Sequence, residues 1–267
     1  MHEGMLLEDI TFTREQFGAM DALGVAALKH VDREFGTGYP HFSGGKRGGL
    51  AYHNGHHTRA VREGAIRFCQ DVGCSPTETK TAEVAADEHD SVQLKSRGVM
   101  ERESADRYER GLRKYRLPEP SIIAGRLAIL GTEPIMQGNR VVGQMVSRLH
   151  FPSKAAERVA MGVACADFGE LYMPLAPYLS HRLWQEIKGT APNKTLPMES
   201  FVAFQTGQAA LHQNYRYPHP RGERLFGRLR GPVTTYQEKV LRQTEAGTLE
   251  SFDQLLKQDL AFAAKLS

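Results

Sequence analysis

The stretch Tyr52-His53-Asn54-Gly55-His56-His57-Thr58-Arg59-Ala60-Val61 decides how the rest of the chain is interpreted. If this stretch is helical, His53 and His57 lie one turn apart on the same face, because residues at positions i and i+4 stack along a helix. Two imidazoles on one face can share a metal ion, or one can bind the metal while the other transfers a proton. The alternative is a pair of ordinary, partly buried histidines, which this stretch alone does not exclude.

Two later segments favour the metal hypothesis. Ala85-Ala86-Asp87-Glu88-His89-Asp90 places a nitrogen and an oxygen ligand, His89 and Asp90, at the end of a predicted helix. Ala164-Cys165-Ala166-Asp167-Phe168-Gly169 places Asp167 in an otherwise apolar helix, where a carboxylate without a cation is costly. Two histidines and two aspartates suit a divalent metal ion. We therefore expect His57, His89, Asp90 and Asp167 to converge, although they are far apart in the sequence.

The order of these motifs resembles the HD superfamily of metal-dependent phosphohydrolases, and Tyr52 to Val61 is similar to the catalytic domain of cyclic nucleotide phosphodiesterases. The resemblance covers roughly residues 45 to 175. It implies an all-α HD-domain helical bundle whose four ligands hold one or two divalent ions (Mn, Zn, Mg, Fe or Co). It also implies that His53 is the general acid and that Glu103, or less favourably Glu101, orients the attacking water. The alternative for Glu103 is a stabilising charge at a helix N-terminus.

The sequence departs from the phosphodiesterase pattern in three places. Gln93 stands where a second histidine usually follows His-Asp, and the residues Phe168-Gly169-Glu170 also differ. A glutamine that would hold a base cannot be placed, Gln205 and Gln208 being the candidates. Three functions stay open as a result. They are a phosphodiesterase acting on a cyclic or linear nucleotide with metal-activated water, an HD nucleotidase or nucleotide-polyphosphate phosphohydrolase, and a non-catalytic metal-bound regulatory module. His53 argues against the last, since a structural metal site needs no proton donor.

Substrate contacts are expected from the segment before the His-rich stretch. The glycine-rich stretch from Gly36 to Gly49 contains Lys46 and Arg47, which could reach a phosphate. It is not a Walker loop, because no strand precedes it and no Lys-Ser/Thr pair closes it. An exposed basic loop is the alternative. Asn54 and Gln205 complete the predicted substrate-binding residues, and a nucleotide or other small phosphoester is the predicted partner.

Composition is consistent with a large helical domain in the cytoplasm. The 267 residues are 40% hydrophobic and carry a net charge of +3, which fits an anionic substrate without requiring nucleic acid. Arginines between positions 216 and 230, near Tyr215 and Tyr217, are the alternative site for a polynucleotide. The three cysteines form no CxxC pair and are predicted to be reduced thiols. We expect no signal peptide and no membrane span, because no apolar run approaches about 18 residues.

Helix start signals define the expected elements of the first part of the chain. Thr13 and Gln16 form a capping box for a helix ending near Phe35, and Ser75, Pro76 and Glu78 open the helix that ends at His89. Residues 91–102 read as a polar connection, with the next helix starting at Glu103. Pro152-Ser153 precedes the helix that contains Asp167. We find no period-two alternation strong enough to predict a sheet.

A second unit is predicted at the C-terminus. The composition of residues 189–196 shifts to Gly, Pro, Asn, Lys and Thr, which marks a boundary between an HD-type domain at 1–190 and a helical extension at 191–267 packed on it. Thr234 is predicted to cap a helix. The last helix, over 249–266, has an apolar stripe of Leu249, Phe252, Leu256, Leu260 and Ala263. That stripe packs on the domain or on a second copy in a homodimer.

Overall fold

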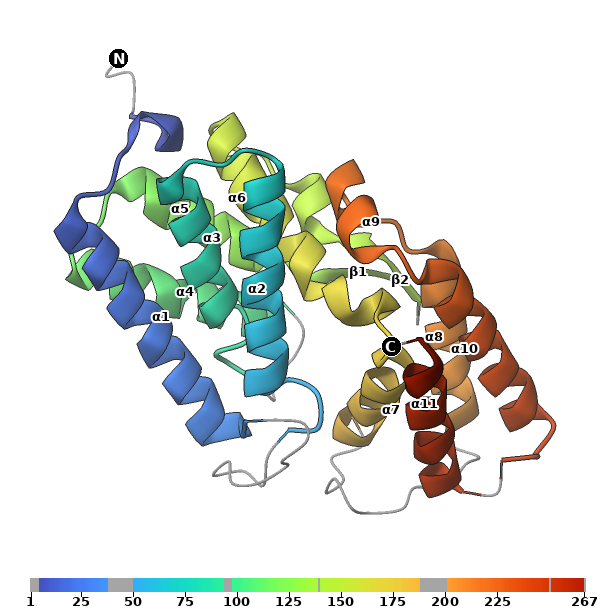
Figure 1. Ribbon diagram of the computed structural model, residues 1–267. Coiled ribbons are helices and arrows are strands. Elements are labelled where there is room, and N and C mark those ends of the chain that lie inside the picture. Colours follow the sequence, from blue (N-terminus) through green and yellow to red (C-terminus); the bar gives the residue numbers. More distant parts are fainter. Residues whose placement is uncertain are drawn as a thin grey trace.

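The structure is a computed structural model that describes residues 5–37, 50–93, 98–138, 140–187, 201–249 and 251–266. Helices dominate this part of the chain, so the predicted all-α class is confirmed (Figure 1). Lys46, Arg47 and the predicted boundary at 189–196 lie outside the described residues, and the division of the chain near residue 190 stays a prediction. Among the described helices, none is long and apolar enough to cross a membrane.

The first half of the chain forms a helical bundle. Its elements are η1 (Leu7–Asp9), α1 (Arg14–Phe35), α2 (Gly55–Asp71), α3 (Pro76–Glu88), α4 (Val99–Lys114), α5 (Glu119–Gly131) and α6 (Lys154–Asp167). Helix α3 is the central member, because it contacts α1, α2, α4, α5 and α6. Most of its residues are buried, including the alanines Ala82, Ala85 and Ala86, whose small side chains permit close helix packing.

The second half adds helices beside this bundle (Figure 1). They are η3 (Gly169–Tyr172), α7 (Ala176–Ile187), α8 (Val202–Asn214), α9 (Pro220–Phe226), α10 (Arg230–Glu245) and α11 (Phe252–Leu266). Leu211, Tyr215 and Phe226 from this half belong to the main hydrophobic core. A smaller core joins Trp184 of α7 to Phe201, Val240 and Phe252. The predicted core position of Trp184 is confirmed, since it is 5% exposed.

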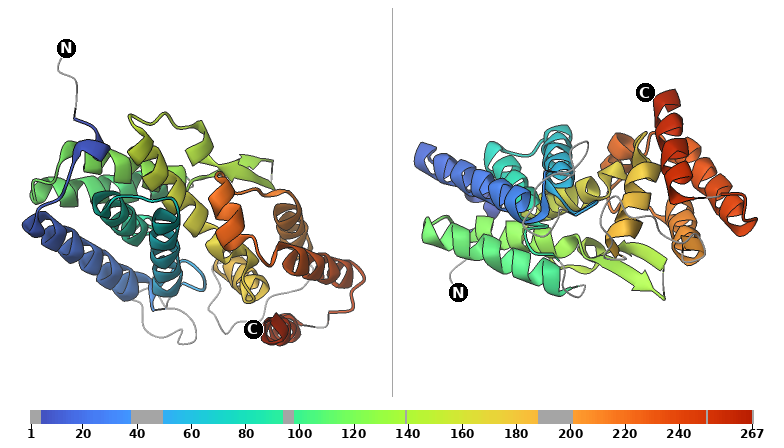
Figure 2. Two further views of the ribbon diagram at one scale, coloured as in Figure 1. Left: turned by 45° about the horizontal axis from the view of Figure 1, so that its top comes forward. Right: turned by 90° about the horizontal axis from the view of Figure 1, so that it is seen from below.

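A two-stranded antiparallel hairpin was not expected. Strands β1 (Pro134–Gln137) and β2 (Arg140–Gln144) pair with an irregularity between Ile135 and Met136, and η2 (Met145–Arg148) follows. Figure 2 shows the hairpin at one edge of the molecule, where the bundle meets the C-terminal helices, and β2 contacts α8. Strands of four and five residues are too short for a period-two pattern to be recognised, so the prediction of no sheet was wrong here.

The capping predictions are confirmed at the helices that precede the site. The Thr13 side chain accepts from the Gln16 amide at 3.2 Å, and the Gln16 side chain accepts from the Thr13 amide at 2.9 Å. Ser75 and Glu78 form the same reciprocal pair at the start of α3. Each box satisfies amides that helix geometry leaves unpaired.

Two boundary predictions were wrong, and the predicted apolar stripe of the last helix was wrong in part. Helix α4 begins at Val99 and not at Glu103, because the Gly98 amide donates to the Glu101 side chain at 2.7 Å and so closes the first turn earlier. Thr234 lies inside α10, which begins at Arg230. Leu249, Phe252 and Ala263 of the predicted apolar stripe are buried as expected, whereas Leu260 is 38% exposed. The buried face of α11 also includes Leu255 and Asp259, whose carboxylate contacts His181 of α7.

Asp87 is a buried carboxylate between α1 and α3. A Cβ atom on Gly24 of α1 would lie 2.6 Å from Asp87 Oδ2, so the close approach of the two helices depends on that glycine. Neither carboxylate oxygen has a hydrogen-bond partner among the described residues. Burial raises the pKa of Asp87 to about 7, although Arg62, 3.8 Å away, acts in the opposite direction. The charged form therefore destabilises the folded protein.

We predict that Asp87→Asn flattens the pH dependence of stability. The folded state binds the Asp87 proton more tightly than the unfolded state, whose pKa is about 3.9, so stability falls as the pH rises from about 4 through 7. Urea denaturation in the presence of a chelator should show that the free energy of unfolding falls between pH 5 and pH 8 by roughly 1–3 kcal/mol less in the variant. Asp106→Asn, at an exposed side chain, is the control. Parallel pH profiles for Asp87→Asn and wild type would contradict the assignment.

Candidate metal centre

Asn54 fixes the start of α2 and hence the position of His57. Its Oδ1 atom accepts from the amides of His56 (3.0 Å) and His57 (3.4 Å), and its Nδ2 atom donates to the Leu50 carbonyl. Asn54 is 3% exposed, so its side chain is an N-cap and the prediction that it binds substrate was wrong. His53 consequently precedes the helix and does not share its face. The rings of His53 and His57 are nevertheless neighbours, with centroids 5.9 Å apart.

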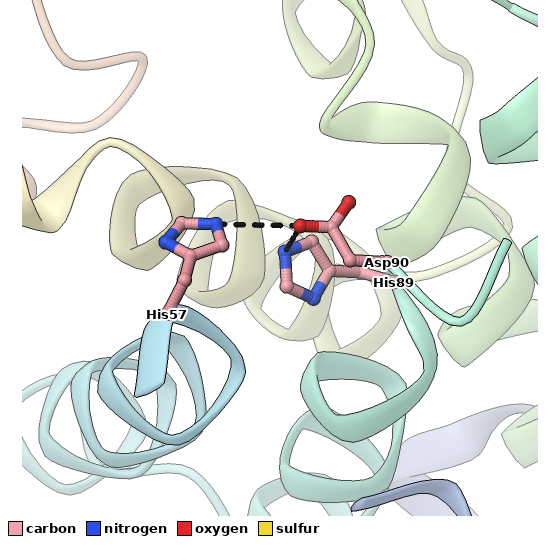
Figure 3. A group of neighbouring side chains, drawn as sticks. All are labelled: His57, His89 and Asp90. Carbon is pink, nitrogen blue, oxygen red and sulfur yellow. Dashed lines mark ion pairs between the residues drawn. The ribbon is translucent and has the colours of Figure 1, made fainter. Parts of the chain in front are cut away.

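His89 and Asp90 lie directly after the last residue of α3. The His89 Nδ1 atom donates to the Ala86 carbonyl at 2.7 Å, which leaves Nε2 as the nitrogen that faces His57. Figure 3 shows His57 coming from α2 and the other two side chains from the end of α3, with dashed lines from one Asp90 oxygen to both imidazoles. The end of the central helix thus meets the first turn of α2.

The four predicted ligands come together. One ligand atom each from His57, His89 and Asp90 lies within 4.8 Å of the other two. Asp90 Oδ2 is 3.4 Å from His57 Nε2 and 3.2 Å from His89 Nε2. Asp167, the last residue of α6, places its Oδ1 atom 3.3 Å from His57 Nε2 and 3.6 Å from His89 Nε2. The helices α2, α3 and α6 therefore bring together residues that span 110 positions of the sequence.

The donor set fits a divalent cation. The Nε2 atoms of His57 and His89 and the Oδ2 atom of Asp90 are buried and have no hydrogen-bond partner among the described residues. Buried polar atoms are normally hydrogen-bonded, so three such atoms facing one point need an explanation. Imidazole nitrogens and carboxylate oxygens are ligands for Mn, Zn, Fe or Co, and a cation between them would satisfy all three. The cluster could thus hold a metal ion.

Further side chains orient the ligands. Glu170 Oε2 accepts from His57 Nδ1 at 2.8 Å, which directs the other nitrogen toward Asp90. Gln144 of β2 donates to Asp167 Oδ2 at 3.3 Å, and the Tyr215 hydroxyl donates to Gln144 at 2.8 Å. In the sequence, Glu170 stands out only as a departure from the phosphodiesterase pattern, and no motif marks Gln144. The capping and spacing signals of the sequence are local, whereas these contacts are not.

The charges of the cluster favour a cation. Burial alone would lower the pKa of His57, but the neighbouring carboxylates of Asp167, Glu170 and Asp90 raise it to about 10. Burial alone would raise the pKa of Asp90, but His89 beside it holds that pKa well below its usual range. The imidazoles therefore bind protons where a metal ion could bind instead. Metal affinity should fall as the pH falls, since the proton and the cation compete for the same nitrogens.

His53 is held by Glu186 of α7. The His53 Nδ1 atom contacts Glu186 Oε1, and Glu186 Oε2 accepts from the amides of Tyr52 (2.8 Å) and His53 (3.0 Å). Burial alone would lower the pKa of His53, but the Glu186 carboxylate raises it. His53 Nε2 has no partner in the described part of the chain, and His53 lines the same pocket as His89 and Asp90. No motif in the sequence marks Glu186 as a partner of His53.

Three of the four ligand candidates, His89, Asp90 and Asp167, line a pocket with a volume of about 490 Å³. Apolar side chains from the hairpin, η3 and α7 form much of its wall, namely Val141, Phe168, Leu171, Leu179 and Leu183. Glu101 lines the pocket, whereas Glu103 lines a different cavity between α1 and α4. Positions two residues apart on a helix point to nearly opposite sides, so the choice of Glu103 over Glu101 was wrong on geometric grounds.

Gln205 does not reach this pocket. Its side chain is fully buried among the C-terminal helices, where Oε1 lies 3.1 Å from His181 Nε2 and Nε2 donates to Gln237. Its amide is engaged with His181 and Gln237 away from the pocket, so the prediction that it binds substrate was wrong. Gln208, one turn later on α8, does line the pocket and contacts Ser180.

Several side chains of the arginine-rich segment form ion pairs within the protein. Arg221 and Arg224 pair with Asp71 of α2, and Arg230 donates to Glu223. Tyr215 and Tyr217 are 1% and 7% exposed, so neither offers a free ring for base stacking. These contacts attach the segment to the bundle.

Comparison with known proteins identifies the fold. No protein-family model and no curated protein sequence matches the chain. Among solved structures, it is similar to Bacillus subtilis YpgQ in complex with ADP, with a TM-score of 0.52 and 11% identity over 86% of this chain and 96% of YpgQ. A Lactobacillus plantarum structural-genomics protein is similar with a TM-score of 0.51 and 12% identity, over 88% of this chain and 100% of the other. At this identity the likeness concerns the fold alone.

We predict that Asp90→Ala loses the metal. The substitution removes the carboxylate oxygen that lies near both imidazole nitrogens. Loss of a residue that only supports a metal ligand typically lowers metal affinity ~10-fold or more, so loss of a ligand itself should lower the affinity for Mn²⁺ at least ~10-fold. Calorimetric titration with Mn²⁺ measures the affinity, and elemental analysis of the purified protein measures the metal content. Asp106→Ala is the control, because that carboxylate pairs with Arg126 on the bundle surface. Wild-type metal content in a folded Asp90→Ala protein would refute the centre.

Proposed function

We propose that the chain is a metal-dependent phosphohydrolase of the HD type that hydrolyses a nucleotide phosphoester. The observation that carries this proposal is the convergence of the unpaired His57, His89 and Asp90 atoms beside a histidine whose free nitrogen faces the same pocket. A metal cluster and a positioned proton donor are the two components that ester hydrolysis needs at neutral pH.

His57, His89, Asp90 and Asp167 would hold the cation. When bound, a divalent cation polarises the phosphoryl group, neutralises its charge and activates water. The protein supplies the remaining functions. Glu170 keeps the His57 ring in one orientation, and Gln144 does the same for the Asp167 carboxylate. Glu101, which lines the pocket, is the candidate for orienting the water.

His53 would protonate the leaving oxygen. Glu186 fixes Nδ1 and raises the pKa of the ring, so that Nε2 carries a proton toward the pocket. Protonation matters most when the leaving group is a poor alkoxide such as a ribose hydroxyl. The His53 side chain is 27% exposed, which leaves room for a substrate to reach the ring.

A nucleotide is the substrate class that the pocket favours. Its apolar wall suits the face of a base, and its volume is in the range of small-molecule sites. The complex of the similar YpgQ fold with ADP supports the same class. A nucleotidase or nucleotide-polyphosphate phosphohydrolase, the second candidate, would use the same ligands with a different leaving group.

A substrate screen of the Mn²⁺-loaded protein tests the proposal. We expect hydrolysis of at least one member of a panel of cyclic nucleotides, nucleoside mono- and polyphosphates and bis-p-nitrophenyl phosphate. That activity should be absent in Asp90→Ala and retained in Asp106→Ala. Full metal occupancy without hydrolysis of any of these compounds would instead favour a regulatory module.

We predict that His53→Ala separates the proton donor from the metal ligands. Metal content should stay unchanged, while kcat on a ribose ester falls by roughly 10²–10⁴. The loss should be much smaller on a p-nitrophenyl ester, whose leaving group hardly needs a proton. The exposed His150→Ala is the control. Equal losses on both esters, or loss of the metal, would show that His53 is a ligand or a structural residue.

A further inference from the structure

Helix α2 ends in a Schellman motif that brings two cysteines together. Gly73 adopts a left-handed conformation with φ 73°, and the Cys74 amide donates to the Cys69 carbonyl at 2.9 Å. In this motif the residue after the glycine packs its side chain against the residue five positions earlier. The geometry of the helix end therefore places Cys74 on Cys69, although no CxxC pattern marks the pair.

The backbone contact satisfies the distance requirement of a disulfide. With the amide and carbonyl 2.9 Å apart, standard bond lengths keep the two Cα atoms within about 6.8 Å, which is the upper end of the disulfide range. The two side chains are close enough for the Cys69 thiol to influence the pKa of Cys74. A bond between them therefore needs a change of side-chain rotamers and not a rearrangement of the helices.

The two thiols differ in environment. Cys69 is fully buried, whereas Cys74 is partly exposed. The Cys69 thiol lowers the pKa of Cys74, and Arg158 of α6 acts in the same direction. Burial and the nearby Glu78 carboxylate act in the opposite direction. The neighbouring Cys74 thiol, together with burial, raises the pKa of Cys69. Cys74 therefore forms the thiolate, the reactive species, more readily than Cys69 does.

We propose that Cys69 and Cys74 form a redox-active dithiol that a hydroperoxide converts into a disulfide across the turn between α2 and α3. Cys74 is the attacking sulfur and Cys69 the resolving sulfur. Their site lies at the opposite end of α2 from His57, about 18 Å away along the helix axis, so it is separate from the metal centre.

The reaction balances in two steps. The Cys74 thiolate attacks the terminal oxygen of hydrogen peroxide, the O–O bond breaks, and with one proton the products are the Cys74 sulfenic acid and water. The Cys69 sulfur then attacks the Cys74 sulfur, its proton leaves with the hydroxyl as a second water, and the S–S bond forms. Two thiols are oxidised by two electrons, and the peroxide is reduced to two waters.

Cys165 of α6 provides an internal control. It is fully buried and free, and burial raises its pKa to about 12. Trypsin leaves Cys69 and Cys74 together on the peptide of residues 68–80 and Cys165 on the peptide of residues 159–182. Oxidation of the pair and of the control cysteine can therefore be followed separately in one digest.

The test is limited oxidation of the folded full chain by hydrogen peroxide, followed by digestion and mass spectrometry. We expect peptide 68–80 to lose two hydrogen atoms, to regain them with a reductant, and to react at least ~10-fold faster than the Cys165 peptide. In Cys69→Ser the Cys74 sulfenic acid should persist and be trapped by dimedone. In Cys74→Ser neither product should form, and Cys165→Ser should behave like wild type.

The wild-type digest alone decides the proposal, so a variant that fails to fold leaves it falsifiable. Absence of the internal disulfide, or oxidation of Cys165 at the same rate as the pair, would overturn it. Retention of the fast-reacting thiol in Cys74→Ser would overturn the assigned roles. None of these outcomes depends on hydrolytic activity or on bound metal.

Discussion

The structure depends on three buried polar atoms that nothing in the described protein satisfies. His57 Nε2, His89 Nε2 and Asp90 Oδ2 face one another where water is largely excluded, and leaving such atoms unpaired costs several kcal/mol in total, by the usual ~1–3 kcal/mol each. A fold tolerates that cost only if something else binds there. A cation removes it and also converts the like charges of Asp90 and Asp167 from a repulsion into a chelating pair.

The bundle is arranged so that this cluster can form. Helix α3 lies among α1, α2, α4, α5 and α6 and ends at the ligands, while α2 begins and α6 ends there. Small residues allow the approach. A Cβ atom on Gly64 of α2 would lie 2.9 Å from the Cβ atom of Ala166, the residue before Asp167. A larger side chain at either position would push α6 and its aspartate away from His57.

Local signals in the sequence predicted several helix starts and the metal-ligand candidates. The side chains that orient these ligands depend on contacts between residues far apart in the sequence. Capping boxes at Thr13 and Ser75 located two helices, and the four ligand candidates were all brought together. The same local rules favour Asn54 as an N-cap, and a His53 outside the helix follows from that. Glu170 and Glu186 could not be predicted, because they contact His57 and His53 across 113 and 133 residues. Glu101 faces the pocket and Glu103 does not, because the two residues point to nearly opposite sides of α4. Choosing between them from the sequence would have required the correct start of α4.

The C-terminal helices contribute to the site through α7. This helix carries Glu186, whose carboxylate accepts from the amides of Tyr52 and His53. It also carries three residues that line the pocket, namely Leu179, Ser180 and Leu183. On its other face, His181 Nδ1 lies 2.6 Å from Asp259 of α11, and the Tyr236 hydroxyl of α10 donates to the same carboxylate at 3.0 Å. His181 and Asp259 are both completely buried, and removing one partner of such a pair strongly destabilises the folded protein. The position of one pocket wall is therefore set by helices that carry no metal ligand, and these helices belong to the framework of the site.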